Sequence, residues 1–189
     1  MHTDIVFPNN NESEFIELAK KLRYKGLCFV YNYHKFNQKA FDKLKESDIK
    51  LSFGVLAGAN EVRKAKKLSE LVFVKSSDKD RAVIENNKGL FLYGLEKDAK
   101  RDFIHHRAGL NQVLSKLAYK NNVKVCVSFS DILTSKDVER ANILGRMMHN
   151  IRICRKYKVG MVIGSFASEP FEMRSTHDLM AFGKVLGME

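Results

Sequence analysis

The chain has few of the residues that mark fibrous, linker-rich or disulfide-bonded proteins. Its 189 residues include 2 prolines and 11 glycines, which excludes collagen-like and linker-rich classes. The three cysteines, Cys28, Cys126 and Cys154, are an odd number and form no CxxC pair. This excludes a disulfide framework and a cysteine zinc site, and it favours a reducing compartment.

Long apolar segments and targeting signals are also missing. The apolar run at residues 26–31 is far shorter than the roughly 20 residues that a membrane-spanning helix needs. The N-terminal residues 1–6 lack the basic segment that opens a signal peptide. We therefore expect a cytoplasmic protein with no membrane partner.

Acidic residues are outnumbered by basic ones. Lys and Arg total 33 against 22 Asp and Glu, which gives a formal charge of +11 and a pI near 9.6. The composition is that of a globular protein, with 44% hydrophobic and 29% charged residues. A surplus of this size favours a polyanionic partner such as nucleic acid. The alternative is a basic surface that is only solvated.

Seven short apolar runs alternate with amphipathic stretches. The runs are rich in Val, Ile, Leu and Phe and mostly lack polar alternation, which is typical of strands buried on both faces. They cover residues 5–7, 27–31, 49–56, 71–74, 90–93, 123–129 and 161–166. Because no linker interrupts them, we expect residues 1–189 to form a single domain.

Serial βα units predict an open doubly wound sheet or a closed barrel. Seven short βα units of similar size favour an α/β, TIM-barrel-like (β/α) barrel with about seven parallel strands. An eight-unit barrel usually needs about 250 residues, so this barrel is expected to be irregular or incomplete.

Capping residues predict where several helices begin and end. Asn11 is expected to cap the first helix and Gly26 to end it, while Asn60 and Asp78 are expected to cap two shorter helices. Ser175 with Asp178 is a capping box for the last helix. A long helix is predicted over residues 137–157.

Motifs of independent catalysis are absent from the sequence. There is no GxSxG elbow, no Walker A loop, and no HxH, HxxEH or HExxH spacing. A metal centre would require several histidines and acids to converge at the top of the barrel. The candidates are His2, Asp4, His34, His105, His106 and Asp131.

The strongest local signal is the absence of Asp and Glu between residues 140 and 168. At about 100° per residue, one side of the long helix is predicted to pack on the barrel; it holds Ala141, Leu144, Met147, Met148, Ile151 and Cys154. The opposite side holds Arg146, His149, Arg152 and Lys156. Because no acid interleaves these cations, the stripe favours a polyanion over a lattice of salt bridges. A merely solvated face remains the alternative.

The preceding helix extends this basic surface. Lys116 and Lys120 are one turn apart on it, and Arg101 and Arg107 come before it. Because consecutive units of a barrel are adjacent, the two helices are predicted to be neighbours that share one basic surface.

Several segments, mostly in the C-terminal half, are distinctive as a set. They are RDFIHHR at 101–107, GLNQVL at 109–114, NNV at 121–123, SFSD at 128–131, GRMMHNIR at 145–152, CRKY at 154–157, GSFA at 164–167 and EMRS at 172–175. In these segments the sequence resembles the archaeal and eukaryotic ribonuclease P protein component 3 family. The N-terminal half matches more loosely, and the lean length is similar to the archaeal form.

The resemblance implies a TIM-barrel-like fold related to the polymerase and histidinol phosphatase superfamily. It also implies a subunit of the ribonucleoprotein endonuclease that removes the 5′ leader of precursor tRNA. In that family the RNA supplies the catalytic centre and requires magnesium, so this chain is expected to hold no catalytic residue and no cofactor and to be inactive alone.

The expected partners are ribonuclease P RNA, protein component 2 in direct contact, other ribonuclease P protein subunits, and precursor tRNA indirectly. We expect component 2 on the N-terminal half, near Phe36, Phe41 and residues 62–68. The expected RNA-binding residues are Arg101, Arg107, Lys116, Lys120, Arg146, Arg152, Lys156 and Arg174.

A stand-alone metal-dependent phosphoesterase of the polymerase and histidinol phosphatase type is the alternative. It would use His2, Asp4, His105 and His106 as ligands. Enzymes of that superfamily carry an HxH on the first strand, where this chain reads His2-Thr3-Asp4. This departure argues against independent metal-dependent hydrolysis.

Overall fold

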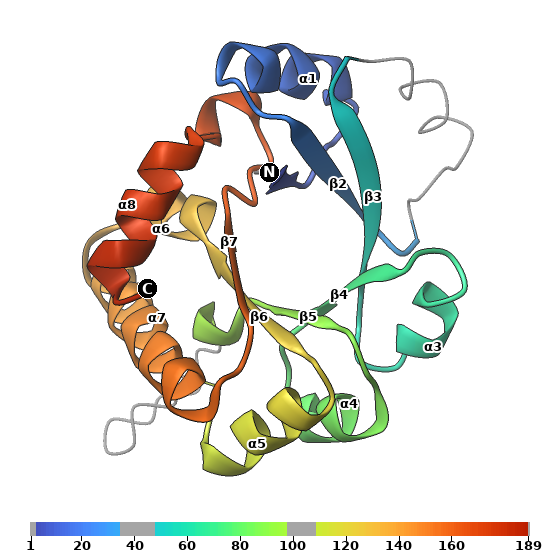
Figure 1. Ribbon diagram of the computed structural model, residues 1–189, viewed down its shortest axis with the longest axis vertical. Coiled ribbons are helices and arrows are strands. Elements are labelled where there is room, and N and C mark those ends of the chain that lie inside the picture. The colour runs from blue at the N-terminus through green and yellow to red at the C-terminus, as the bar shows by residue number, and fades with distance from the viewer. Residues whose placement is uncertain (1–2, 35–47, 98–108, 189) are drawn as a thin grey trace.

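The computed structural model describes residues 3–34, 48–97 and 109–188. Seven parallel strands form one sheet in chain order: β1 (Thr3–Val6), β2 (Gly26–Asn32), β3 (Lys50–Ala57), β4 (Leu71–Lys75), β5 (Phe91–Tyr93), β6 (Lys124–Ser128) and β7 (Met161–Gly164). All seven predicted strands are therefore confirmed, and so is a nearly closed, TIM-barrel-like α/β fold (Figure 1).

Helices surround the sheet on its outer face (Figure 1). They are α1 (Glu12–Lys21), α3 (Val62–Ala65), α4 (Asp80–Asn86), α5 (Gln112–Lys120), α6 (Phe129–Thr134), α7 (Asp137–Tyr157) and α8 (Thr176–Leu186), with short 3₁₀ helices η1 (Leu95–Lys97) and η2 (Pro170–Glu172). No helix in these described ranges is long and apolar enough to cross a membrane. The three cysteines are buried and free.

The barrel closes through the loop after β7 instead of through β7 itself. The amide of Phe166 donates to the carbonyl of Ile5 at 2.7 Å, and the amide of Phe7 donates to the carbonyl of Ala167 at 2.8 Å. Val6 and Ala167 form an isolated parallel bridge. The seam between the first and last strands is thus incomplete, as the short chain led us to expect.

A buried carboxylate fixes this seam. Asp4 Oδ1 accepts hydrogen bonds from the amides of Ser165, at 2.7 Å, and Ile5, at 2.8 Å. Burial raises the pKa of Asp4 to about 6, although the bonds from Ser165 and Ile5 oppose the shift. Asp4 therefore joins β1 to the end of β7, which is a structural role for one proposed metal ligand.

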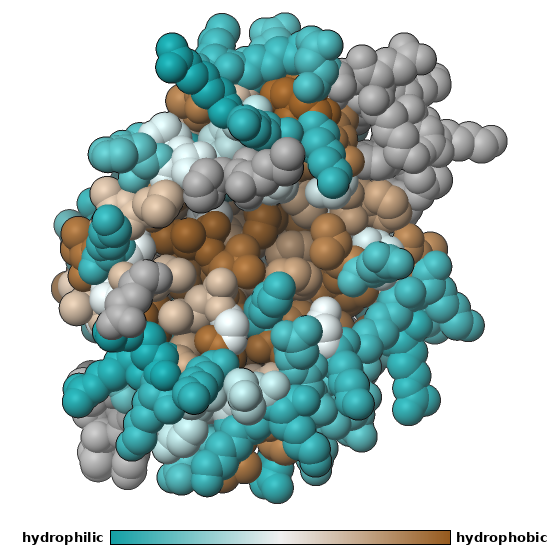
Figure 2. All heavy atoms as spheres, viewed as in Figure 1, coloured by the Kyte–Doolittle hydropathy of each residue, from teal (hydrophilic) through white to brown (hydrophobic). Residues whose placement is uncertain are grey.

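Aromatic rings fill the barrel interior. Phe166 has a φ of 49°, a conformation that bulky residues rarely adopt, and its ring lies 5.3 Å from that of Tyr93 and 5.8 Å from that of Phe7. The ring of Phe73 lies 6.3 Å from the ring of Phe166. Figure 2 shows hydrophobic residues at the centre of the molecule and mainly hydrophilic ones at its edge. The barrel is therefore a packed core and not a pore.

Of the two predictions about the first helix, the one for its start is confirmed in position but not in its side-chain hydrogen bond, and the one for its end is wrong. Asn11 does occupy the N-cap position of α1, but its side chain accepts from the amide of Asn9 and donates to the carbonyl of Ser168. The helix ends at Lys21, near Arg23 in the left-handed region, and Gly26 begins β2 instead. The side chain of Asn11 thus ties α1 to the C-terminal loop and does not cap its helix.

The predicted caps of the two short helices are displaced by one residue. The N-cap residues are Glu61 and Lys79, because neighbouring acids bond the loops before the helices: Glu61 accepts from the amide of Gly58, and Asp80 from the amide of Ser77. The predicted ends of α7 are confirmed. The predicted cap of α8 is also confirmed, since Ser175 Oγ accepts from the amide of Asp178 at 3.2 Å.

Candidate nucleic-acid interface

The two basic helices are neighbours, as predicted. α5 packs directly against α7, and the two lie side by side on the outside of the barrel (Figure 1). Asn111 Oδ1 caps α5 by accepting from the amide of Leu114 at 2.9 Å. Four of the predicted RNA-binding side chains are exposed on these helices: Lys116 and Lys120 on α5, and Arg152 and Lys156 on α7.

Among the described residues, no acid neutralises these four cations. Across the described residues, no hydrogen bond or ion pair involves the side chains of Lys116, Lys120 or Arg152. The ammonium of Lys156 lies 5.6 Å from the ring centroid of Tyr157. Their charge therefore acts outward and attracts a polyanion. We call these four residues the α5–α7 basic surface.

The buried side of α7 differs from the prediction. Met147, Ile151 and Cys154 are buried as expected, but Met148 and Ala141 are exposed. The missed buried positions are Ile143 and Asn150. The reason is that α7 contacts α5, α6, α8 and η1 at once, so neighbouring helices, and not the barrel alone, decide which side is covered.

Arg146 and Arg174 are half-buried, and their guanidinium groups hold nearby loops. Nη1 of Arg146 donates to the carbonyl of Glu96 at 2.9 Å. Nη1 of Arg174 donates to the carbonyls of Phe171, at 2.9 Å, and Met173, at 2.8 Å. The prediction that Arg146 faces only solvent is therefore wrong. Arg101 and Arg107 lie outside the described residues.

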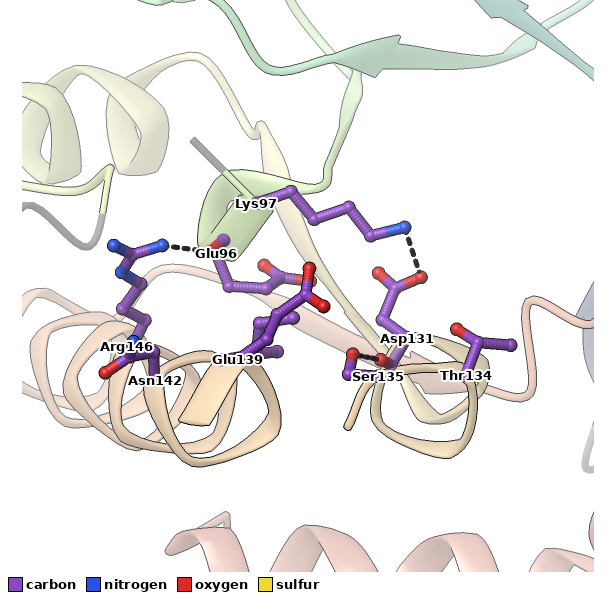
Figure 3. A pocket seen from close by; sticks show the side chains of 9 residues that line it. Glu96, Lys97, Asp131, Thr134, Ser135, Glu139, Asn142 and Arg146 are labelled. Carbon is purple, nitrogen blue, oxygen red and sulfur yellow. Dashed lines mark hydrogen bonds and ion pairs between the residues drawn. The ribbon is translucent and has the colours of Figure 1, made fainter. Parts of the chain in front are cut away.

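A cavity of about 560 Å³ lies between η1, α6 and the first half of α7, and Arg146 is one of its walls (Figure 3). Its lining is mostly polar and comprises Glu96, Lys97, Asp131, Thr134, Ser135, Glu139, Asn142, Ile143 and Arg146. It is built where β5 and β6 end, because Gly94, with a φ of 77°, turns the chain into η1. Ser128 Oγ accepts from the amide of Asp131 at 3.3 Å and so starts α6.

Two buried acids determine the electrostatics of this cavity. Glu96 is 2% exposed and Asp131 is 4% exposed. Asp131 Oδ1 lies 2.6 Å from Nζ of Lys97 and accepts from the hydroxyl of Tyr93 at 3.2 Å. Burial, followed by the charge of Asp131, raises the pKa of Glu96 to about 8. At neutral pH the pair therefore retains a proton.

Sequence reasoning named Asp131 but missed Glu96. The signal was present, since Glu96 follows a buried apolar strand after Gly94 and Leu95, at the end of a barrel where ligands bind. This signal is weak because Glu96 belongs to no recognised motif and has no histidine beside it in the sequence.

A metal-dependent phosphoesterase site does not assemble in the part of the chain that the structure describes. No group of three or more His, Cys, Asp or Glu side chains there is placed to hold a metal ion. Asp4 belongs to the seam, and Nε2 of His34 lies 2.6 Å from Oε1 of Glu61. His2, His105 and His106 lie outside the described residues.

Comparisons with known proteins agree on one group of relatives. A family model described as RNase P subunit p30 matches residues 102–189. Ribonuclease P protein component 3 of Methanosarcina mazei is 28% identical over 186 residues, covering 95% of this chain and 76% of the relative. The same component of Methanosarcina barkeri is 27% identical over 190 residues, covering 95% and 76%.

A solved structure has the same fold. One chain of the cryo-EM structure of archaeal ribonuclease P with mature tRNA superimposes with a TM-score of 0.80 and 23% identity. The match covers 99% of this chain and 83% of that chain. The shared barrel therefore extends through the N-terminal half, beyond the residues that the family model matches.

Proposed function

The chain belongs to the ribonuclease P protein component 3 family, and from this premise we propose that it is a protein subunit of archaeal ribonuclease P. In this role it supports the RNA that removes the 5′ leader of precursor tRNA. The observation that carries the proposal is the α5–α7 basic surface, whose four cations are exposed and not neutralised by acids among the described residues.

The geometry of this surface suits a phosphate backbone. Two adjacent helices present long, mobile cationic side chains, and such contacts position a protein on RNA without reading its sequence. Arg146 and Arg174 contribute positive charge nearby, although their guanidinium groups also bond backbone carbonyls. Arg101 and Arg107 are proposed to extend the same surface.

Catalysis in this proposal belongs to the RNA, which holds the magnesium ions that the reaction requires. The chain contributes no catalytic group of its own, so it should not cleave precursor tRNA alone. Its barrel serves as a rigid body that neutralises phosphates at fixed positions.

A second protein is proposed to dock away from the basic surface. The N-terminal half includes α3, on the opposite side of the barrel from α7 (Figure 1), where Leu68 is 43% exposed while Val62 and Ala65 are buried. We propose that component 2 docks here, so that the two proteins bind the RNA in a fixed position relative to each other. Phe36 and Phe41, which belong to the same expectation, lie outside the described residues.

Reconstitution tests the proposal. Precursor-tRNA cleavage is measured with the RNA and the other protein subunits, with and without this chain, across a magnesium titration. We expect the chain to lower the magnesium concentration needed for cleavage, and a variant with Lys116, Lys120, Arg152 and Lys156 changed to Ala to lose most of this effect.

The outcome that contradicts the proposal is an unchanged magnesium demand when the wild-type chain is added. Cleavage by the isolated chain with magnesium, manganese or zinc would instead support the phosphoesterase alternative. Circular dichroism of the variant is the control: an unchanged spectrum distinguishes a loss of support from a loss of structure.

A further inference from the structure

A second cavity, of about 480 Å³, lies where the second half of α7 meets the end of α8. These two helices contact each other and lie on the outside of the barrel (Figure 1). Met148, Arg152 and Arg155 line the cavity, and their i, i+4 and i+7 spacing puts them along one face of α7. Leu186 and Gly187 line it from the end of α8.

The polar side chains of this cavity are all basic. His149, Arg152 and Arg155 are exposed, and none of the described residues in the lining is acidic. Nη1 of Arg155 donates to the carbonyl of Gly187 at 3.2 Å, which holds this guanidinium between the two helices. Arg152 has no hydrogen-bond or ion-pair partner among the described residues. The cavity therefore presents an available guanidinium, which suits a phosphate group.

The rest of the lining is apolar, which a phosphate group alone does not require. Ile151 and Leu186 are buried in the hydrophobic cluster that joins α7 to α8. Met148 is 49% exposed, so its side chain is open to a ligand. A thioether makes favourable contacts with aromatic rings, and guanidinium planes stack on nucleobases. The lining thus suits a ligand that has a flat aromatic group as well as a negative charge.

We propose that this cavity, which we call the α7–α8 pocket, binds one unpaired nucleotide of an RNA. The base packs against Met148, and Arg152 contacts a neighbouring phosphate. The space of about 480 Å³ falls within the roughly 300–1,000 Å³ that small-molecule sites occupy. Because bases in a duplex are stacked and paired, the pocket adds affinity only for single-stranded RNA.

This inference rests on the proposed function and makes it more specific. Arg152 belongs both to the α7–α8 pocket and to the α5–α7 basic surface, so an RNA bound to that surface passes the mouth of the pocket. An acidic peptide also complements Arg152 and Arg155 in charge. Continuity with the basic surface favours the nucleotide.

Binding of two RNAs to the isolated chain tests the proposal. Fluorescence anisotropy compares a single-stranded oligoadenylate with a hairpin RNA that has the same number of phosphates. Met148→Ala should weaken binding of the single strand by about two- to tenfold, because a contact between a thioether and an aromatic ring is lost. Hairpin binding and the salt slope should not change, because no cation is removed.

Met180→Ala is the matched control. Met180 is 46% exposed on α8 and does not line the pocket, so its replacement should change neither affinity. Unchanged single-strand binding by Met148→Ala, equal losses for the two RNAs, or an equal effect of Met180→Ala would overturn the proposal. None of these results contradicts the proposed function, which fails instead if the wild-type chain shows no salt-dependent RNA binding.

A second measurement uses the wild-type chain and does not depend on the folding of a variant. Adenosine monophosphate is titrated into protein with isotope-labelled methionine methyl groups. Its base should shift the NMR signal of the Met148 methyl group more than that of Met180, and inorganic phosphate should shift neither. Equal shifts of the two signals would overturn the proposal. A shift of the Met148 signal by an acidic peptide but not by the nucleotide would also overturn it and would assign the pocket to a protein partner.

Discussion

The two halves of α7 carry similar cationic side chains in different surroundings. In the first half, Arg140 donates through Nε to the carbonyl of Ser135 at 2.9 Å, and Arg146 donates to the carbonyl of Glu96. In the second half, Arg152 and Lys156 are exposed and bond no carbonyl among the described residues. Arg155, also in the second half, donates to the carbonyl of Gly187 at 3.2 Å. The comparison therefore separates cations that hold neighbouring segments from Arg152 and Lys156, which our proposal assigns to RNA.

The acid cavity beside the first half of α7 gives the largest expected effect. The pKa of Glu96 is raised to about 8, so the folded chain holds a proton that the unfolded chain releases near pH 4.5. Stability from this proton is complete below the unfolded pKa and is lost as pH rises to 8, by on the order of 3 kcal/mol. Chemical denaturation at pH 5 and pH 8, without divalent cations, measures the loss.

The Glu96→Gln variant is the control for this pH dependence. Glutamine cannot ionise, so most of the pH dependence between 5 and 8 should disappear. If the variant loses stability with pH as steeply as the wild type, the buried pair does not hold the proton.

The variants Arg146→Ala and Arg152→Ala compare the two halves of α7 by their effect on the free energy of unfolding. Removing a charged donor from a backbone carbonyl should lower the free energy of unfolding by about 1 to 3 kcal/mol. Arg152→Ala should change it by less than about 0.5 kcal/mol, because Arg152 is exposed and has no hydrogen-bond or ion-pair partner among the described residues. Urea denaturation of the two variants measures the difference, and equal effects would show that the halves do not differ.

A single contact in the second half gives the smallest expected effect. Lys156→Ala should weaken RNA binding only a few-fold and lower the slope of log affinity against log salt by slightly less than one, because one phosphate contact is lost. The decrease should be similar for RNAs of different sequence. A decrease confined to one sequence would indicate base recognition in place of phosphate contact.

The barrel could be predicted because its strands are buried on both faces and read as continuous apolar runs, such as residues 71–74. Helix ends were less predictable. The side chains of Asn11 and Glu61 form hydrogen bonds to loops, and sequence patterns do not show where those loops lie. In the interface, exposure was correct for Lys116, Lys120, Arg152 and Lys156, which follow helical periodicity alone. The predicted exposure was wrong for Arg146, because its partner is a backbone carbonyl 50 residues away in the sequence.

The salt dependence of RNA binding by the isolated chain tests the central claim most directly. Wild type is compared with a variant in which Lys116, Lys120, Arg152 and Lys156 are replaced by Ala. The control has the same charge change on four exposed residues across the barrel: Arg63, Lys64, Lys67 and Lys75. The account predicts that the salt slope falls by about 3 to 4 in the first variant and hardly at all in the control. Equal slopes for the two variants would contradict it, because RNA would then respond to net charge and not to the α5–α7 basic surface.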